Sequence, residues 1–268
     1  SAEAARRIMN TFLTFPLLEQ TGIVRHLFTT RQGGVSRGEF ATMNLSFTRG
    51  DDPASVEENY RRVADALGCR PGDMVASHQT HTTNIRRVTA DDRGKGIVRP
   101  RDYENIDGLI TDEPGLVLVT YFADCVPLYF VDPEHRAIGL AHSGWRGTAG
   151  KMGECMLRAM QEAFGTKPGE VCAVIGPCIC QDCYEVSADV AEQFESYPEA
   201  VRAGKEPGKY QLDLRAVNRK ILLDAGVAEE RLESPGICTC CNSTELFSHR
   251  ASGGRRGNLA AFLGLKED

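Results

Sequence analysis

The sequence predicts a mixed α/β protein in which the 268 residues form one integrated domain. Segments typical of strands and segments typical of helices alternate along the chain, without an internal repeat or a low-complexity tract. The composition, 41% hydrophobic and 25% charged, is that of a soluble globular protein. The charged stretch 86–102 is interpreted as an exposed loop or hairpin and marks no domain boundary.

The first elements are a strand at 22–30, followed by a glycine-rich loop, and a helix at 55–68. Ser55 can cap this helix, and Glu58 stands three residues later, as a capping box requires. Gly68 can end the helix in a left-handed conformation.

The remaining elements follow the same reasoning. Short β-rich runs predict strands, and the segment after them has apolar residues at helical spacing, including a methionine-rich face expected to pack in the core. We expect strands at 116–121, 126–131, 137–141 and 170–177, helices at 150–165, 187–196 and 213–225, and a tail made of a strand, a loop and a final strand.

Charge and hydropathy exclude several functions. The net charge of −6 offers no general attraction for nucleic acid. The longest apolar runs, such as 115–122, are too short to span a bilayer, and no signal peptide is visible at the N-terminus. Ten cysteines in a chain of this size suggest reduced thiols, some of them ligands, and a cytoplasmic location.

Three predicted strand ends carry side chains that bind zinc. His142 follows the strand at 137–141, Cys125 lies in the break between two apolar runs, and His78 and His81 stand near another extended segment. Two imidazoles and one thiolate would leave a fourth zinc position open, as catalytic sites do. Each residue could instead be structural, and Cys125 activated by His142 could be the nucleophile of a hydrolase.

A second group of cysteines has metal-ligand spacing. Cys180 with Cys183, and Cys238 with Cys241, each form a C-x2-C pair. The two pairs could share a structural zinc ion, although their separation is long for a compact zinc ribbon. They could also be reduced, partly buried thiols, or an oxidation-sensitive pair in a non-catalytic metal-binding or redox-sensing protein.

Arginines beside glycines are candidates for binding an anion. Arg146 lies in "GWRGT" and Arg31 opens "RQGGVS", while Arg250, Arg255 and Arg256 also stand near glycines. A guanidinium next to glycines can approach a phosphate or carboxylate closely and bind it in a bidentate manner. Most arginines, however, are simply surface charges.

The motifs "HQTHTT", "IDGLIT", "ADCVPLYF", "AHSGWRGT" and "CTCCNSTELFSHR" occur in the order typical of one family. The chain resembles the YfiH or laccase-domain family, also labelled polyphenol oxidase or peptidoglycan editing factor, over nearly its whole length. The resemblance implies a compact, layered α/β sandwich with mixed β-sheets, in a single domain covering 1–268. It places the zinc ligands, and hence the catalytic centre, on His81, Cys125 and His142.

The resemblance also implies a zinc-dependent purine nucleoside phosphorylase with adenosine deaminase activity, acting on purine nucleosides and inorganic phosphate. Arg146 and Arg31 are then candidates for holding phosphate, Asn44 for contacting substrate, and Asp124 for supporting the ligand Cys125. A multicopper oxidase is not expected, because such sites need many histidines, largely in His-x-His pairs. This chain has six histidines and no such pair.

Overall fold

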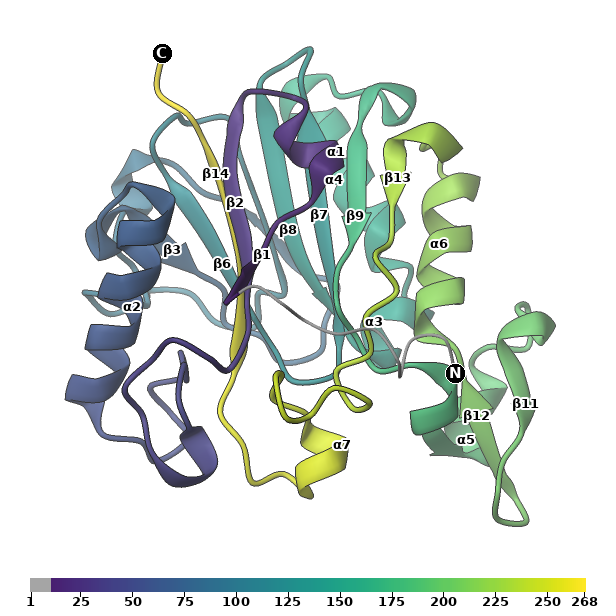
Figure 1. The fold of residues 1–268 in the computed structure, drawn as a ribbon. Helices are drawn as coiled ribbons and strands as arrows, with labels where there is room; N and C mark the ends of the chain where they lie inside the picture. The colour runs from purple at the N-terminus through teal and green to yellow at the C-terminus, as the bar shows by residue number, and fades with distance from the viewer. Residues whose placement is uncertain (1–10) are drawn as a thin grey trace.

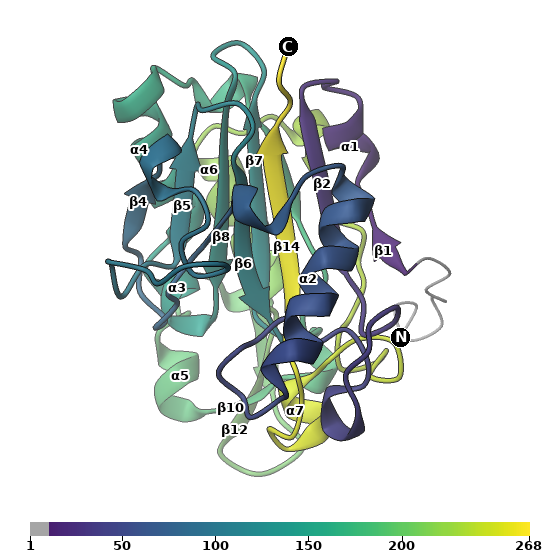
Figure 2. The ribbon, with the colours of Figure 1, turned by 90° about the vertical axis from the view of Figure 1, so that its left-hand side faces the viewer.

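The computed structural model describes residues 11–268, in which two β-sheets stack face to face and helices lie on their outer faces (Figure 1, Figure 2). One sheet has the order β1 (Phe12–Leu13), β2 (Val24–Thr29), β14 (Leu259–Leu265), β6 (Val117–Phe122) and β3 (Met74–Ala76). The other has the order β13 (Leu232–Glu233), β9 (Cys172–Ile175), β7 (Val126–Asp132), β8 (Ala137–Ser143), β5 (Gly108–Thr111) and β4 (Ile85–Arg87). Both sheets combine parallel and antiparallel pairs, so the predicted sandwich with mixed sheets is confirmed.

The central strands are apolar on both faces because both faces are buried. Along β14, Ala261 and Leu263 point into the core between the two sheets, whereas Ala260 and Phe262 point toward the opposite, helix-covered face. This alternation follows from the two-residue period of a strand. It explains why the sequence shows these strands as unbroken hydrophobic runs rather than as polar and apolar residues in turn.

Helices cover each outer face. α2 (Pro53–Leu67) packs on the five-stranded sheet through residues such as Tyr60 and Val63. α4 (Met152–Phe164) and α6 (Leu214–Asp224) pack on the six-stranded sheet, and the predicted methionine face of α4 is buried there. No helix among residues 11–268 is long and apolar enough to cross a membrane.

Shorter elements gather at one end of the sandwich. They are α3 (Trp145–Ala149), α5 (Ala188–Glu192), α7 (His249–Ser252) and a three-stranded antiparallel sheet of β10 (Glu185–Ser187), β12 (Lys209–Leu212) and β11 (Val201–Ala203), which lie low in Figure 1. α1 (Pro16–Glu19) lies at the opposite end. The loops at the lower end carry the functional side chains described below.

Most predicted elements occur, with shifted ends, but four details of the prediction are wrong. Asp52, not Ser55, caps α2, because the chain enters the helix at Pro53; Glu58 instead pairs with arginines one turn later. The helix predicted at 187–196 ends after one turn as α5. The strand expected at the start of the tail is reduced to a single bridge between Cys178 and Cys238.

The fourth difference concerns the stretch 86–102, predicted to be exposed. Asp92 and Lys95 are buried there and form an ion pair at 2.8 Å. A buried charge is tolerated when it is paired in this way, which a charge pattern alone does not reveal.

Candidate functional site

The side chains of His81, Cys125 and His142 converge at the lower end of the two sheets. His81 lies in the loop after β3, Cys125 lies in the turn between β6 and β7, and His142 is near the end of β8. Their donor atoms all lie within 4.8 Å of one another. The structure therefore brings together the three residues that the sequence motifs suggested as ligands.

Asp107, directly before β5, organises two of these residues. Its carboxylate accepts the backbone N–H groups of Thr80, His81 and Thr82 at 3.0–3.1 Å and contacts Nδ1 of His142 at 2.8 Å. A carboxylate on Nδ1 fixes the orientation of the imidazole and leaves the lone pair of Nε2 available to a metal, as is usual for metal-binding histidines. Asp107 thus holds both the His81 loop and the His142 ring.

These contacts shift the pKa values in the site. Burial alone would raise the pKa of Asp107, but its hydrogen bonds with His142, Thr82 and Thr80 lower it to about 2. Burial alone would lower the pKa of His142, but the sulfur of Cys125 and the carboxylate of Asp107 raise it to about 9. Burial and the neighbouring His142 lower the pKa of His81. Since a ligand imidazole must be neutral, a metal ion here would compete with a proton on His142.

A glycine leaves the space that an ion between these side chains requires. A Cβ on Gly144 would stand only 3.0 Å from Sγ of Cys125 and 3.1 Å from Nδ1 of His81. Two imidazole nitrogens and one thiolate form a donor set suited to zinc, and three protein ligands leave one position open. The residues present therefore fit a catalytic zinc ion.

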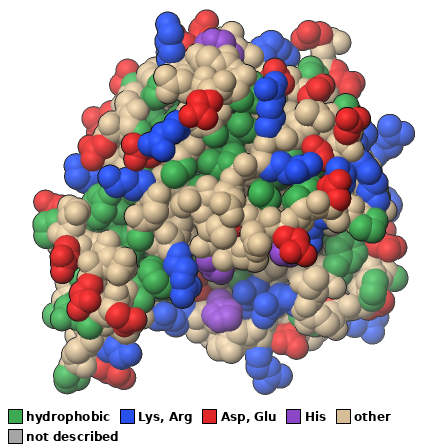
Figure 3. Space-filling view, turned by 180° about the vertical axis from the view of Figure 1, so that it is seen from behind, with side chains coloured by type: hydrophobic (Ala, Val, Ile, Leu, Met, Phe, Trp, Pro, Cys, Tyr) green, Lys and Arg blue, Asp and Glu red, His purple; other side chains and the backbone are tan. Residues whose placement is uncertain are grey.

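The cluster lies in the wall of a cavity of about 430 Å³ that is strongly cationic. Arg49, Arg146, Arg250 and Arg256 line it, whereas Asp124 is the acidic residue of the lining. Figure 3 shows histidine side chains next to lysine or arginine side chains in the lower part of one molecular face. Such a cavity is suited to an anion.

Arg256 is partly engaged by the protein, since its terminal nitrogens contact Gly257, Asn258 and His249. Its Nε is buried and has no hydrogen-bond partner in the protein, and burial, aided by Arg49, lowers the pKa of its guanidinium to about 10. Arg146 lies over the ring of Trp145, 4.4 Å from its centroid. Arg49 donates to the carbonyl oxygens of Gly254 and Arg256, so it holds the 254–256 loop in place.

The other walls of the cavity are aromatic. Tyr121, Phe122, Trp145 and Tyr184 line it, and they come from three separate segments of the chain. A flat heterocycle can stack on surfaces of this kind. The cavity therefore combines metal ligands, cations and aromatic rings.

Asp124 supports the turn that carries Cys125. Its buried carboxylate accepts the hydroxyls of Thr239 and Ser248 and the backbone N–H of Arg250, each at 2.7 Å. Burial raises the pKa of Asp124 in spite of these hydrogen bonds. The carboxylate joins the Cys125 turn to the C-terminal loops, which agrees with a supporting role.

Asn44 and Arg31 do not line this cavity. The Asn44 side chain is fully buried and contacts Ser46, Asp51 and the backbone N–H of Asn258. Arg31 donates to the carbonyl oxygens of Ala41 and Ser243. Both side chains are engaged in holding loops together, so their positions give them no direct contact with a ligand in the cavity.

Sequence reasoning missed Arg49, Tyr184 and His249 as lining residues. Each lies in or beside a loop; Arg49 also stands beside a glycine, Gly50, but in a stretch without the other features of the Arg146 motif. The sequence "FSHRASGGRR" did raise Arg250 and Arg256 as candidates, together with Arg255, which is exposed outside the lining. Only the fold shows which of these neighbours face inward.

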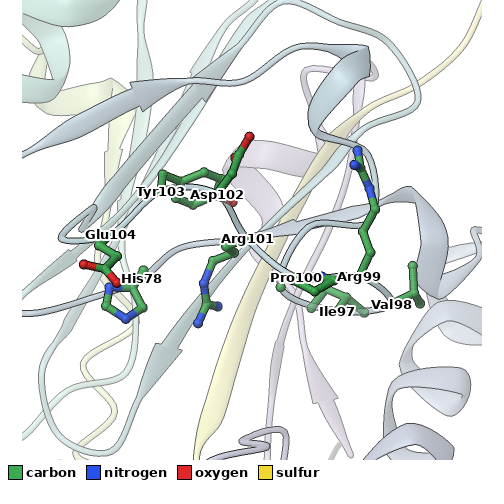
Figure 4. A pocket seen from close by; sticks show the side chains of 10 residues that line it. His78, Ile97, Val98, Arg99, Pro100, Arg101, Asp102, Tyr103 and Glu104 are labelled. Atoms are coloured by element: carbon green, nitrogen blue, oxygen red, sulfur yellow. The ribbon is translucent and has the colours of Figure 1, made fainter.

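A larger cavity, of about 850 Å³, lies elsewhere, against His78 and the segment 96–104 (Figure 4). Two of its polar side chains already have partners: Arg101 donates to the carbonyl of Ser77, and Tyr103 donates to the carbonyl of Ala76. It contains neither a metal-ligand cluster nor a nucleophile among the described residues. We therefore place the functional site in the smaller cavity.

Comparison with known proteins shows which family the chain resembles. A family model described as "multi-copper polyphenol oxidoreductase laccase" matches residues 25–266. The purine nucleoside phosphorylase YlmD of Geobacillus stearothermophilus is 40% identical over 248 residues, which are 90% of this chain and 89% of that protein. The adenosine deaminase RL5, from an unknown prokaryotic organism, is 33% identical over 89% of this chain and 92% of that protein.

A solved structure has the same fold. The crystal structure of the Bacillus licheniformis hypothetical protein YfiH superposes with a TM-score of 0.90 at 36% identity, covering 96% of this chain and 97% of that chain. The sequence match and the structural match both span nearly the whole molecule. This chain therefore belongs to the laccase-domain, or YfiH, family, as the motifs in its sequence indicated.

Proposed function

We propose that this protein is a zinc-dependent purine nucleoside phosphorylase that also deaminates adenosine in the same cavity. The observation that carries the proposal is the convergence of His81, Cys125 and His142 in the wall of a cavity lined by arginines and aromatic rings. The names of the relatives support the substrate class, a purine nucleoside. His81, Cys125 and His142 would hold the zinc ion.

When bound to His81, Cys125 and His142, zinc would supply Lewis acidity. Phosphorolysis requires phosphate to be held against the anomeric carbon while the base departs. Arg256, with an unpartnered Nε, and Arg146, an exposed residue of the lining, are placed to bind phosphate and to stabilise the charge that builds up. Trp145 and Tyr184 offer rings against which the purine can stack.

Asp107 and Asp124 are positioning residues in this proposal. Asp107 holds Nδ1 of His142, which would leave Nε2 to bind the metal. Asp124 holds the segment that carries Arg250 next to the turn that carries Cys125. Neither carboxylate needs to touch substrate to affect the rate.

The proposal is tested by incubating metal-analysed protein with adenosine, with and without phosphate. Adenine and ribose 1-phosphate, formed only with phosphate, indicate phosphorolysis, and inosine indicates deamination. Both activities should disappear with a strong chelator and return with added zinc. Absence of all three products under conditions of full zinc loading refutes the proposal.

One observation favours a different enzyme class. Cys125, His142 and Asp107 form a continuous series in which the thiol contacts the imidazole and the imidazole contacts the carboxylate. This order resembles the triad of a cysteine hydrolase. Activity that survives complete removal of metal but is abolished by alkylation of Cys125 would support the hydrolase instead.

A further inference from the structure

A second cluster of sulfur atoms lies outside the triad. Cys180 and Cys183 lie between β9 and β10, and Cys238 and Cys241 lie between β13 and α7. The four Sγ atoms lie within 4.8 Å of one another. Cys241 is 3.5 Å from Cys183 and 3.8 Å from Cys180, measured between sulfurs.

These separations match a tetrahedral metal site. With Zn–S bonds of about 2.3 Å, the corners of a tetrahedron lie about 3.8 Å apart. A disulfide would need two of the sulfurs at about 2.0 Å, and all ten cysteines of the chain are unpaired. The fold thus brings together two C-x2-C pairs that are separated by more than fifty residues, at the spacing that one ion requires.

The backbone around the cluster is arranged for a charged sulfur. The N–H groups of Cys180 and Cys241 both point at Sγ of Cys238, at 3.2 and 3.3 Å. Donors of this kind stabilise a thiolate. The buried guanidinium of Arg215 interacts electrostatically with Cys238 and donates to the adjacent carbonyl of Ile237. A cation here offsets part of the charge of four thiolates around a divalent ion.

We propose that Cys180, Cys183, Cys238 and Cys241 bind a structural zinc ion, distinct from the one at His81, Cys125 and His142. All four positions of this ion are filled by protein, so no place is left for substrate, and the site is structural by its ligand number. It goes beyond the proposed function, because neither phosphorolysis nor deamination needs it.

The second ion would fix one wall of the catalytic cavity. Thr239, beside Cys238, donates to Asp124, and the backbone N–H of Ile179 donates to the carbonyl of the same aspartate. Tyr184, which lines the cavity, directly follows Cys183. A metal joining the two cysteine loops therefore holds the contacts that support the turn of Cys125.

The test begins with the metal content of the full chain, purified under reducing conditions with zinc. Elemental analysis and native mass spectrometry should give two zinc ions per chain. Cys125→Ala should retain one ion, and Cys241→Ser should retain one. Cys240→Ser, a control in the same loop, should retain both, because Cys240 is not among the four converging thiols.

Cadmium distinguishes the two sites without relying on the folding of Cys241→Ser. Per bound cadmium, the thiolate charge-transfer absorbance of Cys125→Ala should reflect four sulfur ligands, about fourfold more than a site with one sulfur. One zinc per wild-type chain that Cys125→Ala loses, or loss of the second ion in Cys240→Ser, would overturn this ligand set. An intact mass two hydrogens lighter, together with one zinc, would show a disulfide instead.

These outcomes are independent of catalysis. A chain that holds two zinc ions but does not convert adenosine refutes the proposed function alone. A chain that is active with a single zinc ion refutes the second site alone.

Discussion

Gly144→Ala tests directly whether the space beside Cys125 and His81 belongs to a metal. The backbone of Gly144, with φ −80° and ψ −165°, is open to alanine, so the helix that follows can form as before. The added Cβ would stand 3.0 Å from Sγ of Cys125 and 3.1 Å from Nδ1 of His81. Both contacts are a few tenths of an ångström too short, so the ligands must move apart.

The expected effect on zinc affinity follows from this displacement. Zinc–ligand distances in a well-formed site vary by only about 0.2 Å, less than the shift that the Cβ imposes. We expect affinity to fall about 10- to 100-fold, the size of effect seen when ligand orientation is disturbed. The crowding should also cost about 1–3 kcal/mol of unfolding free energy in the metal-free protein.

Zinc affinity is measured by competition with a chelator of known affinity, and metal-free stability is measured by urea unfolding. Gly147→Ala is the control in the same short helix, because its Cβ would meet Ser143 and backbone oxygens rather than a ligand. Its zinc affinity should remain that of the wild type. If Gly144→Ala binds zinc as tightly as the wild type does, the argument that this glycine makes room for the ion is wrong.

Three further predictions concern charge. Asp107→Asn removes the carboxylate from Nδ1 of His142, so chelator competition should show zinc affinity about 10- to 100-fold lower. Arg256→Gln should raise the KM for phosphate about 10- to 100-fold, the equivalent of about 1.5–3 kcal/mol for a charged hydrogen bond, but leave the rate of adenosine deamination unchanged. Arg255→Gln, at the exposed neighbouring position, should change neither the KM for phosphate nor the deamination rate. Burial lowers the pKa of His26 to about 4, so between about pH 6.5 and pH 4 the imidazole takes up a proton in the unfolded chain but not in the folded one. The free energy of unfolding should therefore fall by about 3 kcal/mol as the pH drops from about 6.5 to about 4. In His26→Gln, which keeps an acceptor for the N–H of Phe15, urea titrations should lose this part of the pH dependence, and an unchanged slope contradicts the assignment.

The sequence predicted the layers of the fold better than its connections. The runs at 116–121 and 126–131 are short, rich in β-forming residues and apolar at nearly every position. These features predict buried strands, and the structure has β6 and β7 there. The order in which strands pair was not predictable, because β14 lies between β2 and β6, far from both in sequence. Local patterns contain no information on such long-range pairing.

The ligand residues were suggested by local motifs, but their supporting residues were not. Cys125 and His142 stand out because they interrupt apolar runs. Asp107, which contacts three successive amides around His81, is one aspartate among many in the sequence. Arg49 and Tyr184 enter the cavity only through the tertiary structure. Residues whose role depends on partners 25 or more positions away leave no signature at their own position.

The backbone near the candidate metal ligands explains why those partners are needed. His81 has φ 66° and Asp124, next to Cys125, has φ 115°, conformations that residues other than glycine seldom adopt. Strain of this kind costs on the order of 1–3 kcal/mol per residue and persists only when surrounding contacts enforce it. Asp107 accepts the N–H of His81, and Asp124 uses its own carboxylate to accept three donors from the C-terminal loops. The two carboxylates therefore keep the ligands in positions that regular strands could not reach, which is why loss of either should affect the metal centre before it affects the sheets.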